Sequence, residues 1–305
     1  MSRTGQNDQG RDAHLNLPLG VSLTIGEIVL MVGISVLVKQ VGANIETATI
    51  LLFRYGLCLP LLIAMAVWQR GSRALHISKY RILAFRIAAG LVSLTCFYAA
   101  LGLMSLSKVT VLFQTITLFV TFLAPFMIGE RVGWRRWTAV MIGFAGTIIL
   151  LQPDAEGWTS TGILFGLGSP LFGAIMLIML RRLGQHDSPA STAVWYNGIG
   201  AIIFALLVFV QGLSLPTASS DLMILALIGV LSSFQQFFIA FSHRVAPAST
   251  LAPLRYLSIP VGILAGILFF GEMMTPQILI GSAVIVGSSI FILRREKQLR
   301  AAGVK

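Results

Sequence analysis

The chain has 305 residues, of which 56% are hydrophobic and only 11% are charged. Soluble globular domains carry about 25% charged residues, so this composition excludes a soluble enzyme or a soluble binding domain. An integral membrane protein is indicated instead.

Apolar residues gather into ten segments, each close to the roughly 20 residues that a helix needs to cross a bilayer. The segments are 18–38, 47–68, 82–103, 109–128, 134–151, 161–180, 190–210, 222–241, 249–270 and 276–293. They are too long, and alternate too little, to be the strands of a membrane barrel. We therefore predict an all-α integral membrane fold with ten transmembrane helices.

The first segment follows a polar tail, residues 1–17, and contains Glu27, the only carboxylate well inside a predicted span. A buried carboxylate must be paired or protonated, because burying an isolated charge is costly. Glu27 is therefore a candidate for proton coupling or cation binding. The alternatives are a structural ion pair, for which Arg54 in the second segment is near enough in depth, and a protonated packing residue.

Polar and aromatic side chains recur inside the second to fourth segments and again inside the seventh to ninth. Polar residues within a membrane are the default candidates for a functional site. A rise of about 1.5 Å per residue places those of the first half in an outer band and those of the second half in an inner band. Together they would form the two mouths of a substrate pathway. Its expected residues are Arg54, Tyr55, Tyr98, Gln114, Tyr196, Asn197, Gln235, Gln236, Arg255 and Tyr256.

Some of these positions allow another interpretation. Arg255 lies near its helix start and could extend toward the cytoplasm instead of lining the pathway. Gln235 and Gln236 are separated by about 100° around a helix, so at most one of them faces the pathway. Arg86 lies one turn from the inner end of its segment, and we expect it to be an anchor that extends to the interface.

An internal repeat is marked by Gly129-Glu130 and Gly271-Glu272, which precede the fifth and tenth segments and are 142 positions apart. The same shift aligns the triplet that contains Arg54 with Trp195-Tyr196-Asn197. The chain is thus predicted to be one five-helix unit written twice, at 18–156 and 157–294. Because five is an odd number, the copies must have opposite orientations in the membrane.

Glu130 and Glu272 themselves are expected to be hinge or cap residues. Each directly precedes a helix, and a carboxylate is favoured at the positive end of a helix dipole.

Basic residues mark the orientation of the chain. With the N-terminus inside, 17 of the 22 Lys and Arg residues lie in inner loops and tails, including the tail at 295–305. This positive-inside asymmetry accounts for the net charge of +11 without a nucleic-acid partner. We expect a multi-pass protein of the inner (plasma) membrane with both termini cytoplasmic. Its expected partners are the lipid bilayer and a small-molecule substrate, with a homodimer left open.

The ten spans, the duplication and the Gly-Glu pairs resemble the drug/metabolite transporter superfamily, in its EamA-type branch. The resemblance covers about residues 18–295, and its most specific parts are the two Gly-Glu pairs and Arg54. It implies carriage of small metabolites by alternating access through a central cavity between the halves. The second copy departs from the family pattern in one loop, where Met273-Met274-Thr275-Pro276 replaces Arg131-Val132-Gly133-Trp134.

The substrate is less well specified than the fold. Arginines and aromatic side chains around neutral amides suit a flat, hydrogen-bonding or anionic metabolite. Because riboflavin importers among the carriers it resembles match that chemistry, uptake of a vitamin such as riboflavin is the leading prediction. Export of amino acids, other metabolites or drugs is the alternative.

A channel and an intramembrane enzyme are remote alternatives. An inverted duplication suits alternating access better than a pore built around the membrane normal. We identify no catalytic residues and no metal-ligand motif, and we expect no cofactor. The ATP-binding pattern G-x-x-x-x-G-K-[ST] is absent, so the chain is not expected to hydrolyse ATP.

Overall fold

The computed structural model of the chain describes residues 16–130, 132–151, 160–183, 187–213 and 215–301, and all regular structure within them is helical. The first copy comprises α2 (Leu17–Val41), α3 (Thr47–Arg70), η1 (Gly71–Arg73), α4 (Tyr80–Leu103), α5 (Leu106–Phe113), α6 (Ile116–Ile128) and α7 (Trp134–Leu150). The second copy comprises α8 (Ser160–Leu183), α9 (Pro189–Val210), α10 (Ser219–Val245), α11 (Ala248–Leu251), η2 (Ala252–Leu257), α12 (Ser258–Phe270) and α13 (Pro276–Ala301).

Nine segments of the described chain are long and apolar enough to cross a membrane. α7, with 17 residues, is slightly shorter and supplies the remaining segment of the expected ten. The all-helical membrane fold is therefore confirmed. The structure shows α13 continuing through Ala301, into the segment expected to be a tail. The expected N-terminal tail up to residue 15, the boundary at 156–157 and Arg131 lie outside the described residues.

Local sequence sets the helix ends that matter for the repeat. The glycine of each Gly-Glu pair ends a helix in the left-handed conformation, with φ of 68° at Gly129 and 61° at Gly271. Glycine adopts this conformation without a steric penalty and is the usual residue just beyond a helix C-terminus. The recurring Gly-Glu pair is therefore a helix-ending device repeated at the same place in both copies.

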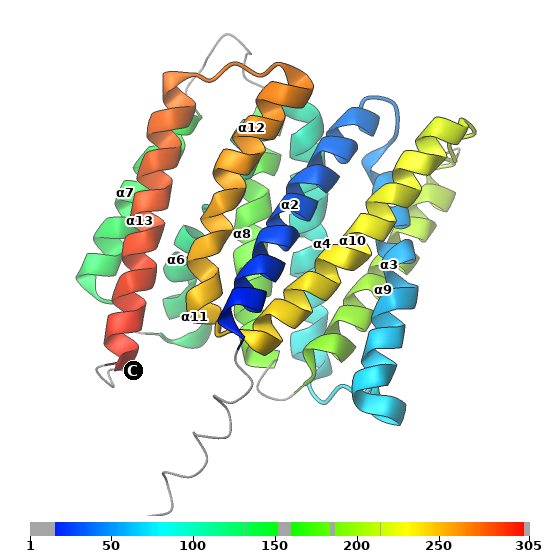
Figure 1. Cartoon of the computed structure of the whole chain (residues 1–305), viewed down its shortest axis with the longest axis horizontal. Coiled ribbons are helices and arrows are strands. Elements are labelled where there is room, and N and C mark those ends of the chain that lie inside the picture. Colours follow the sequence, from blue (N-terminus) through cyan, green and yellow to red (C-terminus); the bar gives the residue numbers. More distant parts are fainter. Residues whose placement is uncertain (1–15, 131, 152–159, 184–186, 214, 302–305) are drawn as a thin grey trace, which may run out of the picture.

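The helices pack in pairs that remain the same when the two copies are exchanged. α3 packs against α9 and α7 against α13, and each of these two pairs joins equivalent helices of the two copies. α5 packs against α12, so the fourth spans of the two copies also contact each other. The contact of α4 with α8 is matched by that of α2 with α10. Figure 1 shows α2 and α8, the first helices of the copies, running in opposite directions. The two halves are thus inverted repeats related by a pseudo-two-fold axis.

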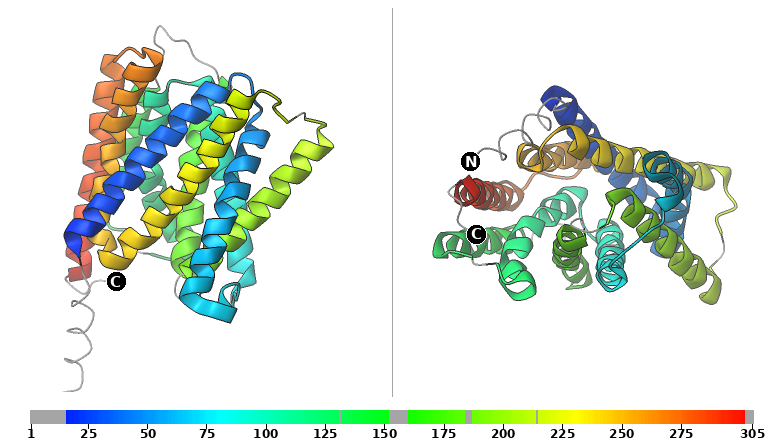
Figure 2. Two further views of the ribbon diagram at one scale, coloured as in Figure 1. Left: turned by 45° about the vertical axis from the view of Figure 1, so that its right-hand side comes forward. Right: turned by 90° about the horizontal axis from the view of Figure 1, so that it is seen from below.

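The views in Figures 1 and 2 place the α7–α13 pair at one edge of the bundle and α3, α9 and α10 at the opposite edge. The start of α2 and the end of α13 lie at the same face. Glycines allow the α7–α13 pair to pack closely, since a Cβ on Gly146 would lie 2.7 Å from Val284 and one on Gly281 would lie 2.8 Å from Leu150. Such contacts hold helices together in lipid, where the hydrophobic effect contributes little.

The fourth span of each copy is interrupted. α5 and α6 are separated at Gln114 and Thr115, and the equivalent span of the second copy runs as 3₁₀ helix through η2 before α12 begins. Both were predicted as single continuous helices. The interruption is stabilised by short-range bonds, including Thr115 N–H to the Leu112 carbonyl at 3.0 Å. Broken helices are tolerated inside a membrane where they are buried in protein, and they often mark functional sites.

Candidate functional site

A hydrogen-bonded pair of tyrosines lies where α3 packs against α9. The hydroxyl oxygens of Tyr55 and Tyr196 are 2.9 Å apart, and the rings meet edge to face with centroids 5.5 Å apart. The Tyr196 hydroxyl donates to the Gly90 carbonyl at 3.2 Å, so Tyr55 donates to Tyr196. Tyr55 is fully buried and stacks on Phe204. The pair therefore joins the equivalent second helices of the two copies through both aromatic and polar contacts.

Two buried arginines flank this pair. The guanidinium of Arg54 lies 5.3 Å from the Tyr55 ring centroid, and that of Arg86 lies 5.0 Å from the Tyr196 ring centroid. A guanidinium at this distance is attracted by the ring quadrupole. Within the described part of the chain, neither arginine forms an ion pair with a carboxylate. Two positive charges thus meet electron-rich rings without a neutralising acidic side chain.

The structure differs from the expectation for Arg86. Its side chain does not extend to the interface, because it is only 7% exposed and donates to the Thr192 carbonyl at 3.3 Å. The reason is packing: α4 lies against both α8 and α9, so this end of α4 is covered by protein. A one-dimensional depth estimate cannot reveal which neighbour covers a helix end.

Several buried polar atoms of α3, α4 and α9 have no hydrogen-bond partner among the described residues. They are Arg54 Nη1, Arg86 Nε, Tyr98 Oη and Asn197 Oδ1. Leaving a buried donor or acceptor unmatched costs about 1–3 kcal/mol. Such groups usually meet water or a ligand. The cluster formed by Tyr55, Tyr196, Arg54, Arg86, Tyr98 and Asn197, called here the tyrosine–arginine cluster, therefore has unused hydrogen-bonding capacity.

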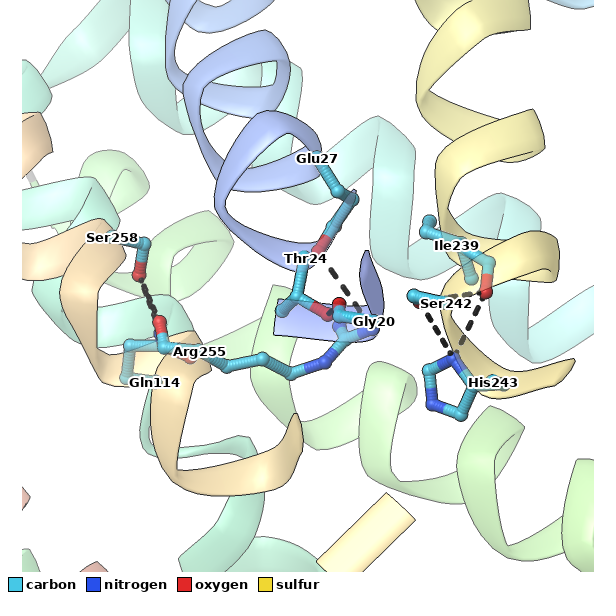
Figure 3. Close-up of polar contacts among 9 residues, drawn as sticks. All are labelled: Gly20, Thr24, Glu27, Gln114, Ile239, Ser242, His243, Arg255 and Ser258. Atoms are coloured by element: carbon cyan, nitrogen blue, oxygen red, sulfur yellow. Dashed lines mark hydrogen bonds and ion pairs between the residues drawn. The ribbon is translucent and has the colours of Figure 1, made fainter. Parts of the chain in front are cut away.

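Glu27 and Arg255 form a second polar group (Figure 3). Arg255 extends from η2 toward α2, where its Nη2 atom lies 3.9 Å from Oε2 of Glu27. The Glu27 side chain is 4% exposed, whereas that of Arg255 is 44% exposed. The distance is at the long end for an ion pair. Glu27 thus has a cationic partner, but this partner is Arg255 of the second copy rather than Arg54.

The two interrupted spans contact each other beside this ion pair. The Gln114 amide, at the break between α5 and α6, donates to Ser258 Oγ and to the Arg255 carbonyl. The Tyr256 hydroxyl donates to Thr117 Oγ1 at 2.9 Å. Both contacts cross the pseudo-two-fold axis from one copy to the other. We call Glu27, Arg255, Gln114, Ser258, Tyr256 and Thr117 the helix-break cluster.

Glu272 caps a helix, but that helix is α5 of the first copy rather than α13, which follows it. Its carboxylate accepts from the backbone N–H of Leu106 and of Ser107, and from the Ser107 hydroxyl at 2.7 Å. Lys39 Nζ lies 3.8 Å from the same carboxylate. The partly positive N-terminus of α5 and the ammonium group both attract the Glu272 side chain. Glu272 therefore ties the copies together at one face of the bundle.

Glu130 makes a different contact at the opposite face. Its Oε1 accepts from Nη1 of Arg136, on the first turn of the helix that follows it, at 2.9 Å. The same face has another carboxylate clamp, in which Asp187 accepts from the backbone N–H groups of Ser78 and Lys79 at 2.6 and 3.2 Å.

Most of the expected pathway residues come together, but in a different arrangement. The sequence placed them in an outer and an inner band, whereas the structure joins residues of both bands in each cluster. The cause is the pseudo-two-fold symmetry, which packs α3 against α9 and the fourth spans of the two copies against each other. Gln235 and Gln236 are half-buried on α10, outside the contacts of the described residues that define the two clusters. No group of three His, Cys, Asp or Glu among the described residues could hold a metal ion.

Sequence reasoning missed Ser258, Thr117, Lys39 and Asp187. Ser258 and Thr117 are short polar residues in apolar spans, and nothing in the local sequence distinguishes them from the other serines and threonines of those spans. Lys39 and Asp187 lie at helix ends, where charged residues are common and carry no distinguishing pattern.

Comparison with known proteins gives two matches to one family description. The EamA-like transporter family matches residues 18–152 and again residues 160–294. A solved crystal structure shares the fold with a TM-score of 0.63, at 17% identity over 93% of this chain and 99% of the other. At that identity the likeness concerns the fold alone.

The named relatives are riboflavin transporters and S-adenosylmethionine uptake transporters. A riboflavin transporter of Rhizobium johnstonii is 31% identical over 69% of each chain, and one of Vibrio cholerae is 34% identical over 61% of each chain. An S-adenosylmethionine uptake transporter of Rickettsia prowazekii is 25% identical over 86% of this chain and 88% of its own length.

Proposed function

The chain belongs to the EamA-like transporter family, and from that premise we propose that it is a secondary carrier that takes up riboflavin or a closely similar flat metabolite. Membership of the family makes it a membrane transporter, and its named relatives are transporters. The proposal concerns the substrate, the direction and the site, and it includes the absence of any enzymatic activity.

The tyrosine–arginine cluster is the observation that carries this proposal. Riboflavin combines a flat aromatic ring system, which stacks on tyrosine, with carbonyl oxygens and hydroxyl groups that accept and donate hydrogen bonds. The cluster offers two tyrosine rings, two guanidinium groups and the unmatched atoms of Arg54, Arg86, Tyr98 and Asn197. Aromatic walls with a few convergent polar groups are typical of small-molecule sites.

The contacts at the two faces suit alternating access. Glu272 joins the copies at one face, and Asp187 clamps the start of α4 to the α8–α9 connection at the other. We propose that the Glu272 contacts hold the first of these faces closed and must break when it opens. The interrupted spans supply backbone that can rearrange without breaking a long helix. The positive-inside asymmetry supports an inner-membrane location with both termini cytoplasmic.

The test is uptake of labelled riboflavin by riboflavin-requiring cells that express the full chain, compared with cells that carry an empty vector. We expect saturable uptake that unlabelled riboflavin abolishes. A normal amount of protein in the membrane without uptake above the empty vector would contradict the proposed substrate. A fusion of a periplasm-dependent reporter to the C-terminus should be inactive if that end is cytoplasmic.

Uptake of S-adenosylmethionine is a second candidate. The named relative with this substrate aligns with 86% of the chain, and the buried carboxylate of Glu27 could neutralise a sulfonium cation. The same cells distinguish the two candidates by competition. Excess unlabelled S-adenosylmethionine should leave riboflavin uptake unchanged under the leading proposal, and labelled S-adenosylmethionine should accumulate only under the second.

A further inference from the structure

A hollow of about 290 Å³ lies where α7 begins beside the last turns of α13, and none of its lining residues belongs to either cluster. Its lining residues are Gly133, Trp134, Arg135, Arg136 and Arg295. The volume is close to the lower end of ligand pockets, which span roughly 300–1,000 Å³. Three of the five lining residues are arginines, so the hollow is strongly basic. We propose that it binds the phosphate head group of an anionic phospholipid.

Arg136 supplies the buried part of this site. Its side chain is 6% exposed, and its Nη1 donates to Glu130 at 2.9 Å. Its buried Nε atom has no partner within the described structure. A buried guanidinium N–H without an acceptor is costly and is matched when an anionic oxygen approaches it. Glu130 neutralises one of the three arginines, which leaves the hollow with a net positive charge.

The start of α7 adds a second attraction for a phosphate. The N-cap residue is Gly133, which has no side chain to cap the helix, and the first turn contains no acidic residue. The backbone N–H groups of a helix start and the positive end of the helix dipole both favour an anion there. Arg135 lies over the exposed ring of Trp134, 5.5 Å from its centroid, which holds the guanidinium next to the helix start.

The surroundings favour a lipid over a free phosphate ion. Trp134 is 71% exposed, as is typical of a residue at the membrane interface. Met141, two turns further along the same face of α7, is also exposed, and so is Phe291, one turn before Arg295 on α13. The basic hollow therefore continues into an apolar surface on which acyl chains can lie. A lipid with its head group in the hollow and its acyl chains along α7 and α13 would contact both the basic region and the apolar region.

Native mass spectrometry of the purified full chain in detergent tests this site. The protein is titrated with phosphatidylglycerol, with phosphatidylcholine and with inorganic phosphate. We expect phosphatidylglycerol adducts to exceed phosphatidylcholine adducts. Arg135→Gln/Arg295→Gln should weaken phosphatidylglycerol binding by roughly 30-fold, because each of the two basic residues contributes to anionic lipid attraction.

The matched control is Arg70→Gln/Arg73→Gln, which removes two exposed arginines at the end of α3 and in η1 and should leave the lipid preference unchanged. If the double variant cannot be purified, Arg295→Gln alone should show a smaller loss in the same direction. Equal lipid preference in wild type and variant would overturn the proposal. Full displacement of the lipid by inorganic phosphate would do so as well, since the site would then recognise a free anion.

Discussion

The hydroxyl groups of Tyr55 and Tyr196 share a hydrogen bond of 2.9 Å, although the residues are 141 positions apart in the sequence. That separation is almost the repeat length of 142 that the Gly-Glu pairs define. Nearly equivalent positions of the two copies thus contact each other at the pseudo-two-fold axis. A carrier whose halves exchange roles during transport needs its substrate near this axis, because a site there is accessible from both sides in turn.

Replacing either tyrosine of this pair by phenylalanine keeps the ring and removes the shared hydrogen bond. Because a typical hydrogen bond contributes about 0.5–1.5 kcal/mol, we expect roughly a 2- to 13-fold rise in KM for riboflavin. The double variant Tyr55→Phe/Tyr196→Phe should resemble Tyr196→Phe alone, since Tyr196→Phe already removes the shared bond together with the bond to the Gly90 carbonyl. Independent, additive effects in uptake kinetics would show that the hydroxyls act separately.

Arg54 is expected to bind the substrate through its unmatched Nη1 atom. Arg54→Gln should abolish uptake while the protein still reaches the membrane. Arg54→Lys should recover only part of the activity, because an ammonium cannot reproduce the planar fork of guanidinium donors. Arg81→Gln, at an exposed position on α4, is the matched control and should transport normally. Normal uptake by Arg54→Gln would exclude this residue from the site.

Glu27→Gln tests the coupling of transport to protons. If the Glu27 carboxylate carries a proton during the cycle, the variant should transport at a rate that does not depend on an imposed pH gradient. Arg255→Gln should alter the same dependence without removing it, because Arg255 is the cationic partner at 3.9 Å. An unchanged response of Glu27→Gln to the pH gradient would indicate a purely structural ion pair.

Glu272→Gln tests whether the cap on α5 controls access to one face. A charged cap contributes about 1 kcal/mol, so its loss should shift the balance between closed and open forms of that face by roughly fivefold. Cysteine labelling at the buried Ser105, which directly precedes α5 and whose hydroxyl makes no hydrogen bond to the described residues, measures this shift. Glu130→Gln, at the opposite face, is the control and should leave labelling at Ser105 unchanged or lower it. Equal labelling in wild type and Glu272→Gln would contradict a gating role.

Asp187 provides a pH test outside the membrane spans. Although partial burial opposes the charged form, the hydrogen bonds from Ser78 and Lys79 lower the pKa of the Asp187 carboxyl below its usual value of 3.8. Its stabilising effect is therefore fully present above that value and is lost as pH falls through the lowered pKa. Asp187→Asn should decrease the Tm at pH 7, and the difference from wild type should shrink on acidification toward pH 3. If the difference in Tm between wild type and Asp187→Asn did not change with pH, the destabilisation would arise from packing rather than from the charge of Asp187.

The fold was largely predictable from particular residues. The length of each apolar segment predicted the helices. The recurring Gly129 and Gly271 predicted the repeat, because glycine is the usual residue where a helix ends with a positive φ. The interruptions at Gln114 and in η2 were not predicted, since the surrounding residues are as apolar as those of a continuous helix. The local amino-acid sequence does not show where contacts with other helices compensate for the loss of the α-helical hydrogen bonds between residues i and i−4.

The site was predictable as a set of residues but not as an arrangement. Arg54, Tyr55 and Glu27 were identified as candidates because a polar side chain is costly to bury in a membrane, and this cost is evident before the contacts of the side chain are known. The partner of Glu27 and the environment of Arg86 depend on which helices pack together, and helical depth alone does not determine neighbours. The contact of Glu272 with α5 lies 165 to 166 positions away in the sequence, beyond the reach of any local capping pattern.

The central claim is transport of riboflavin through the tyrosine–arginine cluster. It is tested most directly by counterflow in proteoliposomes that contain only the purified chain and are preloaded with unlabelled riboflavin. We expect transient accumulation of labelled riboflavin with the wild-type protein, no accumulation with Arg54→Gln and wild-type accumulation with Arg81→Gln. Absence of accumulation with a folded wild-type protein, or equal accumulation with Arg54→Gln, would contradict the account.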